Sequence, residues 1–149
     1  YQTMVNYVVL FPSDHPLAQS QSKLDLSTIS SDQEFVTFGD VYPLEMQGMD
    51  AKLSEKLQKN ARYSVANLLT AAALVHETGV PAIVDPFSAR LAMNNSGVMV
   101  RPLLQKFQYH IAIITRGVDT MTKDTRHLAN SLISAFEDDP VVRANENDS

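Results

Sequence analysis

The sequence predicts an α/β fold, a mostly parallel sheet flanked by helices, in which short apolar runs alternate with helical patterns along 149 residues. Such alternation is typical of a parallel sheet covered by helices. The run Val80–Val84 is wholly apolar and has no polar alternation, which suits a central strand buried on both faces. The composition, 44% hydrophobic and 19% charged, is that of a globular domain that can bury such a sheet.

The expected strands are short runs rich in β-branched and aromatic residues, each ended by Pro, Gly or a polar turn. The first run ends at Pro12 and the second ends at Gly39. In chain order we expect strands over Met4–Phe11, Glu34–Phe38, Ala61–Ser64, Val80–Val84, Val98–Val100 and Gln108–Thr115.

Helix starts are indicated by capping residues that precede periodic apolar positions. Asp40 is the expected cap of a first helix, which continues to about Lys59 with Met46, Met49, Leu53 and Leu57 on one face. Ser64 is the expected cap of a second helix over Val65–Thr78, ended by Gly79.

Two further helices follow. Asp85-Pro86 opens one that runs to about Asn94, because Asp caps a helix and Pro suits its first turn. Thr122 or Asp119 caps the last, which runs to about Asp138 with Leu128 and Leu132 on its apolar side. We expect the polar tail 139–149 to be disordered.

Several function classes are disfavoured by composition and motifs. The net charge is −5 and no long Lys/Arg run exists, so this segment lacks the footprint of a nucleic-acid binder. There is no cysteine, and the four histidines lack ligand-like spacing, so we expect neither metal nor other cofactor. No apolar run approaches the ~18 residues of a membrane span. Phosphate-loop and nucleophile-elbow motifs are missing, so we expect that the chain is not an enzyme.

The candidate site lies in three loops that follow predicted strands. In open parallel sheets, ligands bind outside the carboxyl ends of the strands, where helix N-termini present free N–H groups. Together the loops offer hydroxyls, aromatic rings and carboxylates suited to a small polar or zwitterionic ligand. The candidate residues are Thr37, Phe38, Gly39, Asp40, Tyr42, Ser64, Val65, Val84, Asp85 and Phe87.

A simpler interpretation exists for each of these residues. Asp40, Ser64 and Asp85 are also ordinary helix caps, and Phe38 and Phe87 are also ordinary core side chains. The argument for a site therefore depends on the convergence of the three loops on one edge of the sheet.

The order of motifs resembles the effector-binding domain of LysR-type transcriptional regulators from about Tyr7 to Phe136. The segment Val8–Ala18 is similar to the family's strand followed by Pro and His-Pro-Leu-Ala. The helix Val65–Thr78 followed by Gly79–Pro86 is similar to the family's helix, Gly, apolar strand and Pro. The stretch 84–89 particularly resembles the lysine-biosynthesis activator and the opine-catabolism regulators, which favours an amino acid or a derivative as effector.

The resemblance implies one lobe of a periplasmic-binding-protein-like domain, in which two lobes enclose an effector. It assigns residues 2–116 to the second lobe with its hinge strand and 117–138 to a helix that packs on the first lobe. By the same resemblance, we expect the first lobe and the DNA-binding helix-turn-helix to lie outside the given residues. A cytoplasmic homodimer or tetramer without membrane contact is also implied.

Three functions remain open at this stage. The first is the effector-sensing domain of a regulator that binds DNA through its helix-turn-helix. The second is a solute-binding protein of a transporter, which has the same fold and ligand chemistry but needs an export signal that the sequence does not show. The third is an enzyme without a familiar motif, for which a strongly perturbed His or carboxylate in a closed pocket would be the evidence.

Overall fold

A computed structural model describes residues 1–38, 48–95 and 97–147 of the chain. These residues form two compact units, Asn6–Tyr109 and Tyr1–Val5 with His110–Ser149. Strands β1 (Gln2–Asn6) and β7 (Gln108–Ala112) pair with each other, and each passes from one unit into the other.

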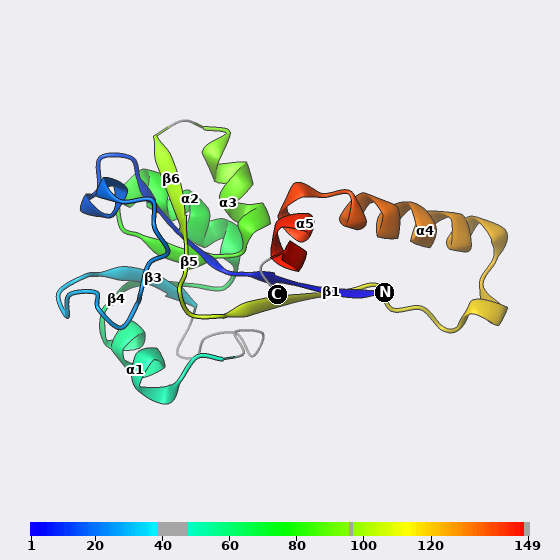
Figure 1. Cartoon of the computed structure of the whole chain (residues 1–149), viewed down its shortest axis with the longest axis horizontal. Helices are drawn as coiled ribbons and strands as arrows, with labels where there is room; N and C mark the ends of the chain where they lie inside the picture. The colour runs from blue at the N-terminus through cyan, green and yellow to red at the C-terminus, as the bar shows by residue number, and fades with distance from the viewer. Residues whose placement is uncertain (39–47, 96, 148–149) are drawn as a thin grey trace. The chain divides into compact units, whose positions relative to one another are not determined.

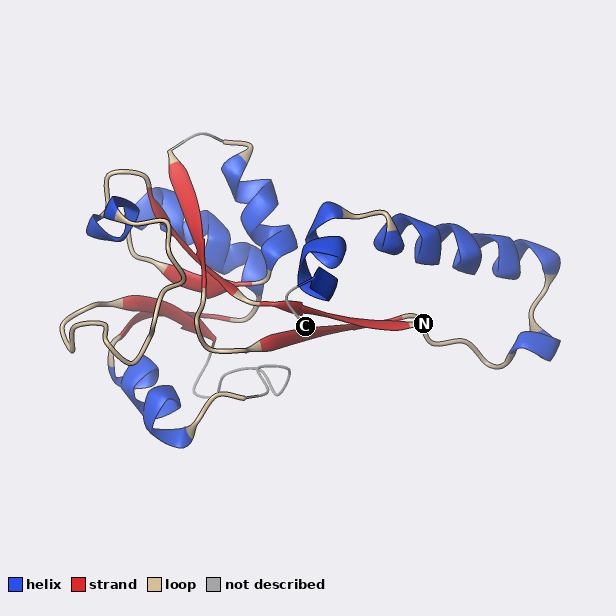
Figure 2. Ribbon diagram, viewed as in Figure 1, coloured by secondary structure: helices blue, strands red, loops and turns tan. Residues whose placement is uncertain are grey.

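The larger unit contains a five-stranded sheet in the order β4-β3-β5-β2-β6. Its strands are β2 (Val8–Pro12), β3 (Phe35–Phe38), β4 (Ala61–Val65), β5 (Ala82–Val84) and β6 (Val98–Pro102). Helices α2 (Leu68–Thr78) and α3 (Pro86–Met93) cover one face of this sheet, and α1 (Ala51–Lys59) lies at the other (Figure 1, Figure 2).

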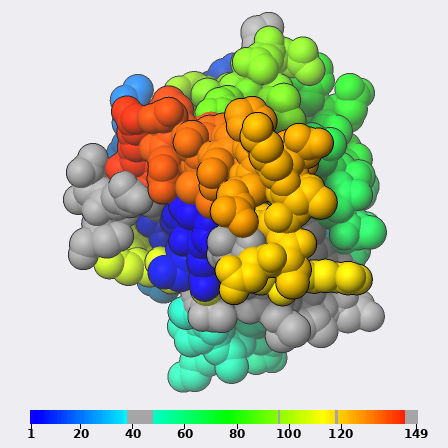
Figure 3. All heavy atoms as spheres, turned by 90° about the vertical axis from the view of Figure 1, so that its right-hand side faces the viewer, coloured from blue at the N-terminus to red at the C-terminus, as the bar shows by residue number. Residues whose placement is uncertain are grey.

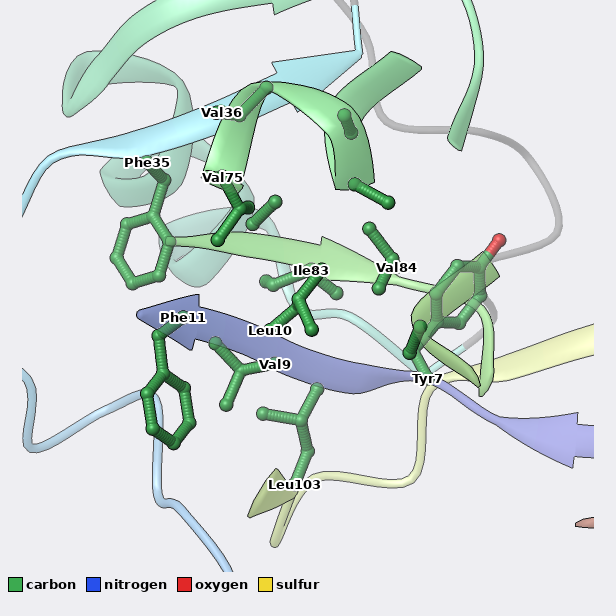
Figure 4. Close-up of a cluster of buried hydrophobic side chains, with 14 of the residues drawn as sticks. Tyr7, Val9, Leu10, Phe11, Phe35, Val36, Val75, Ile83, Val84 and Leu103 are labelled. Carbon is green, nitrogen blue, oxygen red and sulfur yellow. The ribbon is translucent and has the colours of Figure 1, made fainter. Parts of the chain in front are cut away.

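Four of the five strands run in the same direction, so the expected mostly parallel sheet is confirmed. β3 is parallel to both β4 and β5, whereas β2 is antiparallel to β5 and to β6. Figure 4 shows β2 running against β3 and β5. The sheet is therefore mixed, and the reversed strand β2 lies between the central strand β5 and the edge strand β6.

The core of this unit lies on both sides of β2 and β5. Phe11, Leu10 and Ile83 are fully buried, and Phe35 and Val75 pack in the same cluster (Figure 4). All three residues of β5 are buried, as the wholly apolar run Val80–Val84 predicted. Because β5 is covered on both faces, it forms the rigid centre from which the neighbouring loops project.

Two predicted helix starts were wrong. α2 begins at Leu68, and its cap is Asn67, because Ser64 remains in β4 opposite Thr37. α1 begins at Ala51, and Asp50 Oδ1 accepts the N–H of Leu53 at 2.9 Å. The predicted cap Asp40 lies outside the described residues.

Other predicted boundaries were correct. Gly79 ends α2 in the left-handed conformation at φ 74°, and its N–H donates to the Val75 carbonyl. Asp85 caps α3, and Thr122 caps α4 (Lys123–Glu137). The first predicted strand, Met4–Phe11, is instead two strands that separate at Tyr7.

The smaller unit holds α4, the pair β1–β7 and α5 (Pro140–Asn147). The rings of Phe136 and Tyr1 stack at 6.4 Å between centroids, which ties the end of α4 to β1. Leu128 and Leu132 of α4 are 60% and 42% exposed, and Figure 3 views this helix, in orange, from the end at which it begins. The tail was expected to be disordered, but it forms α5, on which Val142 is fully buried.

Candidate functional site

The three loops of the candidate site follow strands that end at the same edge of the sheet. β4, β3 and β5 are neighbours and run parallel, so their last residues Val65, Phe38 and Val84 share one edge. We call this edge the rim. The convergence on which the predicted site depends is therefore present in the fold.

The two hydroxyl residues at the rim differ in availability. Thr37 and Ser64 are register partners on β3 and β4. Thr37 is buried, and its Oγ1 donates to the Tyr63 carbonyl at 3.4 Å, so it has a structural role. Ser64 is exposed, and its hydroxyl is available to a ligand.

Two of the predicted valines are packing residues. Val84 is fully buried and lies opposite Val8 in the sheet, and Val65 is partly buried against the core. Their side chains fix the strand ends in place. Phe38 ends β3 at the rim, and Gly39, Asp40 and Tyr42 lie outside the described residues.

The N-terminus of α3 is already occupied by its own cap. Asp85 is 5% exposed, and its Oδ1 accepts the N–H groups of Phe87 and Ser88, each at 2.9 Å. Pro86 has no N–H to offer. Phe87 is half-buried, with the Arg90 guanidinium carbon 5.7 Å from its ring centroid. The start of α3 is thus poor in free donors and carries a negative charge.

The N-terminus of α2 is more open. Among the described residues, Asn67 Oδ1 accepts one N–H, that of Thr70 at 2.8 Å, and Asn67 is neutral and exposed. Helix geometry leaves the N–H groups of Leu68 and Leu69 without an intrahelical acceptor. These two amides and the Ser64 hydroxyl form the part of the rim best suited to an anionic group.

Asn67, Leu68 and Leu69 were not among the predicted site residues. The cue for them was available, because Asn at position 67 is as good a cap as Ser at position 64. Only the pairing of Ser64 with Thr37 moves the start of α2 onward by one turn.

Two other features were not found among the described residues. They contain no cluster of three or more His, Asp or Glu side chains that could hold a metal ion. None of the described helices is both long and apolar enough to cross a membrane.

Comparison with known families shows which family the chain belongs to. The sequence profile of the LysR substrate binding domain matches residues 4–137. The chain belongs to the LysR substrate-binding domain family. This family consists of the regulatory domains of transcription regulators and not of enzymes, which agrees with the expectation from the motif search.

Solved LysR-family domains have the same fold. The regulatory domain of MetR from N. meningitidis is 21% identical with a TM-score of 0.55, covering 93% of this chain and 66% of that one. HinK from Pseudomonas aeruginosa is 18% identical with a TM-score of 0.57, covering 86% and 43%. The effector binding domain of QuiR, solved in complex with shikimate, is 19% identical with a TM-score of 0.55, covering 86% and 59%.

The LysR-family chain described here spans less than two thirds of the length of each of these three structures. No curated protein sequence matched it. The α/β fold predicted from the sequence and the resemblance to LysR-type effector-binding domains are both confirmed.

Proposed function

We propose that this chain senses a small polar metabolite, an amino acid or an amino-acid derivative, for a LysR-type transcription regulator. The observation that carries the proposal is the rim, where Ser64 and the amides of Leu68 and Leu69 lie beside the end of β3. Within the parent protein the rim would form one wall of a cleft between two lobes. Residues 2–116 would be the second lobe, and 117–138 would be the helix that packs on the first.

The charges at the rim favour a ligand with both signs. The open, neutral N-terminus of α2 favours a carboxylate, whereas the Asp85 carboxylate at the start of α3 favours a cation. The strands that precede these helices, β4 and β5, lie on either side of β3, so the ends of the two strands are two strand spacings, about 10 Å, apart. A ligand with a carboxylate and a distant ammonium or amide group suits that separation better than a compact zwitterion.

The effect on transcription would follow from a shift in populations. An effector with different affinities for two arrangements of the lobes favours one of them, and the oligomer transmits the difference to its DNA contacts. The parent would be a cytoplasmic homodimer or tetramer that binds DNA through a helix-turn-helix outside this chain. Family membership disfavours the alternative of a transporter's solute-binding protein.

The test is an NMR titration of the chain with a panel of amino acids and N-carboxyalkyl amino acids. Saturable shifts should appear in the amides of residues 64–70 and of Asp85, Phe87 and Ser88. Ser64→Ala should weaken that binding about five- to tenfold, because the loss of one partly exposed hydrogen bond costs about 1 to 1.5 kcal/mol. Ser131→Ala, on the exposed side of α4, is the matched control.

Two results would count against the proposal. One is a complete lack of shifts at the rim across the panel at millimolar concentrations. The other is binding that Ser64→Ala and Ser131→Ala change equally.

A further inference from the structure

The second feature that points to a ligand lies on α1, away from the rim. Lys52, Lys56 and Lys59 follow one another at spacings of four and three residues, which places them on one side of the helix. With four other residues they line a hollow of about 470 Å³. The remaining lining residues are Ser31, Asp32, Glu55 and Asn60.

Lys56 is fixed in place by neutral groups. Its Nζ donates to the carbonyl oxygens of Ile29 at 2.6 Å, Ser27 at 3.3 Å and Leu26 at 3.5 Å. Carbonyl oxygens orient an ammonium group but do not cancel its charge. The acidic neighbour influenced by this charge is Asp25, whose pKa is lowered by hydrogen bonds from Ser27 and Gln105 first and by Lys56 last.

The charges of the other two lysines are likewise not offset by an ion pair in the described part of the chain. The ion pairs found among the described residues join other side chains, and neither Lys52 nor Lys59 takes part in one. Three lysines face two carboxylates, Asp32 and Glu55, so the lining has a formal charge of +1. The whole chain carries −5, which makes this hollow a local positive region on an acidic protein.

The hollow and the rim lie at opposite edges of the sheet. Ser31 and Asp32 precede β3, and Asn60 immediately precedes β4, so the hollow adjoins the amino-terminal ends of these parallel strands. The rim is formed by their carboxyl-terminal ends. A ligand in the hollow therefore does not compete with a ligand at the rim.

We propose that the α1 hollow binds a small polyanion, a phosphate ester or a polycarboxylate, independently of the effector. Lys56 supplies a fixed positive charge, and Lys52 and Lys59 close on the ligand from either side. Ser31 and Asn60 supply neutral polar groups for its remaining oxygens. Asp32 and Glu55 repel any anion, so binding requires a ligand that interacts with several of the lysines at once, which chloride cannot do.

The test is an NMR titration of the full chain with pyrophosphate and, separately, with citrate, against sodium chloride at matched ionic strength. We expect saturable shifts in the amides of residues 31–32 and 52–60. Lys52→Ala and Lys59→Ala should each weaken binding about three- to fivefold, as expected for a partly exposed charge pair. Lys52→Arg should keep it, and Lys123→Ala, an exposed lysine on α4, should change nothing.

The probes also separate the possible ligands. Binding of pyrophosphate alone supports a phosphate ester, and binding of both probes supports polyanions in general. Shifts that follow ionic strength without saturation, or that persist when Lys52→Ala and Lys59→Ala are combined in one chain, would overturn the proposal. So would binding to phosphatidylglycerol vesicles without binding to either soluble anion. None of these outcomes depends on Ser64, so the sensor proposal is tested separately.

Discussion

Asp85→Ala should destabilise the chain by about 2 kcal/mol through α3. Removal of a helix cap costs about 1 kcal/mol. Here one carboxylate oxygen accepts two N–H groups, those of Phe87 and Ser88, and the residue is only 5% exposed. The second donor left without an acceptor in this partly buried place adds about 1 kcal/mol.

Urea unfolding followed by far-UV circular dichroism measures this loss, since the chain has no Trp for fluorescence. Asp50→Ala is the matched control, because Asp50 is exposed and accepts one N–H, from Leu53, and should cost about 1 kcal/mol. Asp85→Asn keeps an acceptor and should lose only the charge–dipole part, about 0.5 kcal/mol. If Asp85→Ala changed the free energy of unfolding no more than Asp50→Ala, the inference that α3 depends on a doubly used cap would be refuted.

Two further predictions concern the turns around the sheet. Gly79→Ala should lower the free energy of unfolding, measured in urea, by about 1 kcal/mol, because φ at this position is 74°. The added Cβ would meet only Pro12 Cγ, at 3.9 Å, so conformational strain and not a clash is responsible. His15 accepts the N–H of Leu17 through Nδ1, and burial lowers its pKa below 6.5 against the opposing effect of Asp14. The unfolded state therefore binds the proton more readily, so this contribution to stability is full above pH 6.5 and is lost as the pH falls through the folded pKa. His15→Gln should flatten the pH dependence of the free energy of unfolding, and a pH profile unchanged by this substitution would contradict the reasoning.

The fold class could be predicted because burial leaves a direct mark on composition. Val80–Val84 had to be covered on both faces, and β5 is. The direction of β2 could not be predicted, because an apolar run has the same residue pattern whether its neighbouring strands are parallel or antiparallel. The break at Tyr7 was hidden for a similar reason, since the apolar pattern continues across it.

The helix starts show where local signals were insufficient and where one was overlooked. Ser64 and Asn67 are both good caps, and only the tertiary pairing of Ser64 with Thr37 decides between them. α5 is a different case. Asp139-Pro140 repeats the Asp85-Pro86 signal, and Asp139 Oδ1 accepts the N–H of Val141 at 2.9 Å. The polar composition of the tail favoured disorder, although Asp139-Pro140 is a helix-start signal.

The convergence of the three candidate loops was predictable, but the different environments of their residues were not. Parallel neighbouring strands place their ends together, so the rim follows from topology. Topology does not say which of the two hydroxyls is exposed. Thr37 and Ser64 are similar residues whose environments differ only once the sheet forms. Likewise, Asp85 and Asn67 both cap helices. Asp85 accepts two N–H groups and carries a charge, whereas Asn67 accepts one and is neutral.

This difference between the two caps leads to a prediction in which stability and binding change in opposite directions. Asn67→Asp should stabilise α2 by about 0.5 kcal/mol, because a negative charge interacts favourably with the positive end of a helix. The same charge occupies the place where we expect the effector's carboxylate, and should repel it.

Urea unfolding and the NMR titration together measure the two effects. Asn67→Ser, a neutral cap of similar strength, is the control and should leave both nearly unchanged. A variant that is more stable and binds acidic effectors at least tenfold more weakly would support the assignment of the carboxylate to α2. If Asn67→Asp bound them as tightly as Asn67→Ser, the anionic group of the effector would not lie at the start of α2, and the rim would have lost the donors on which its proposed chemistry depends.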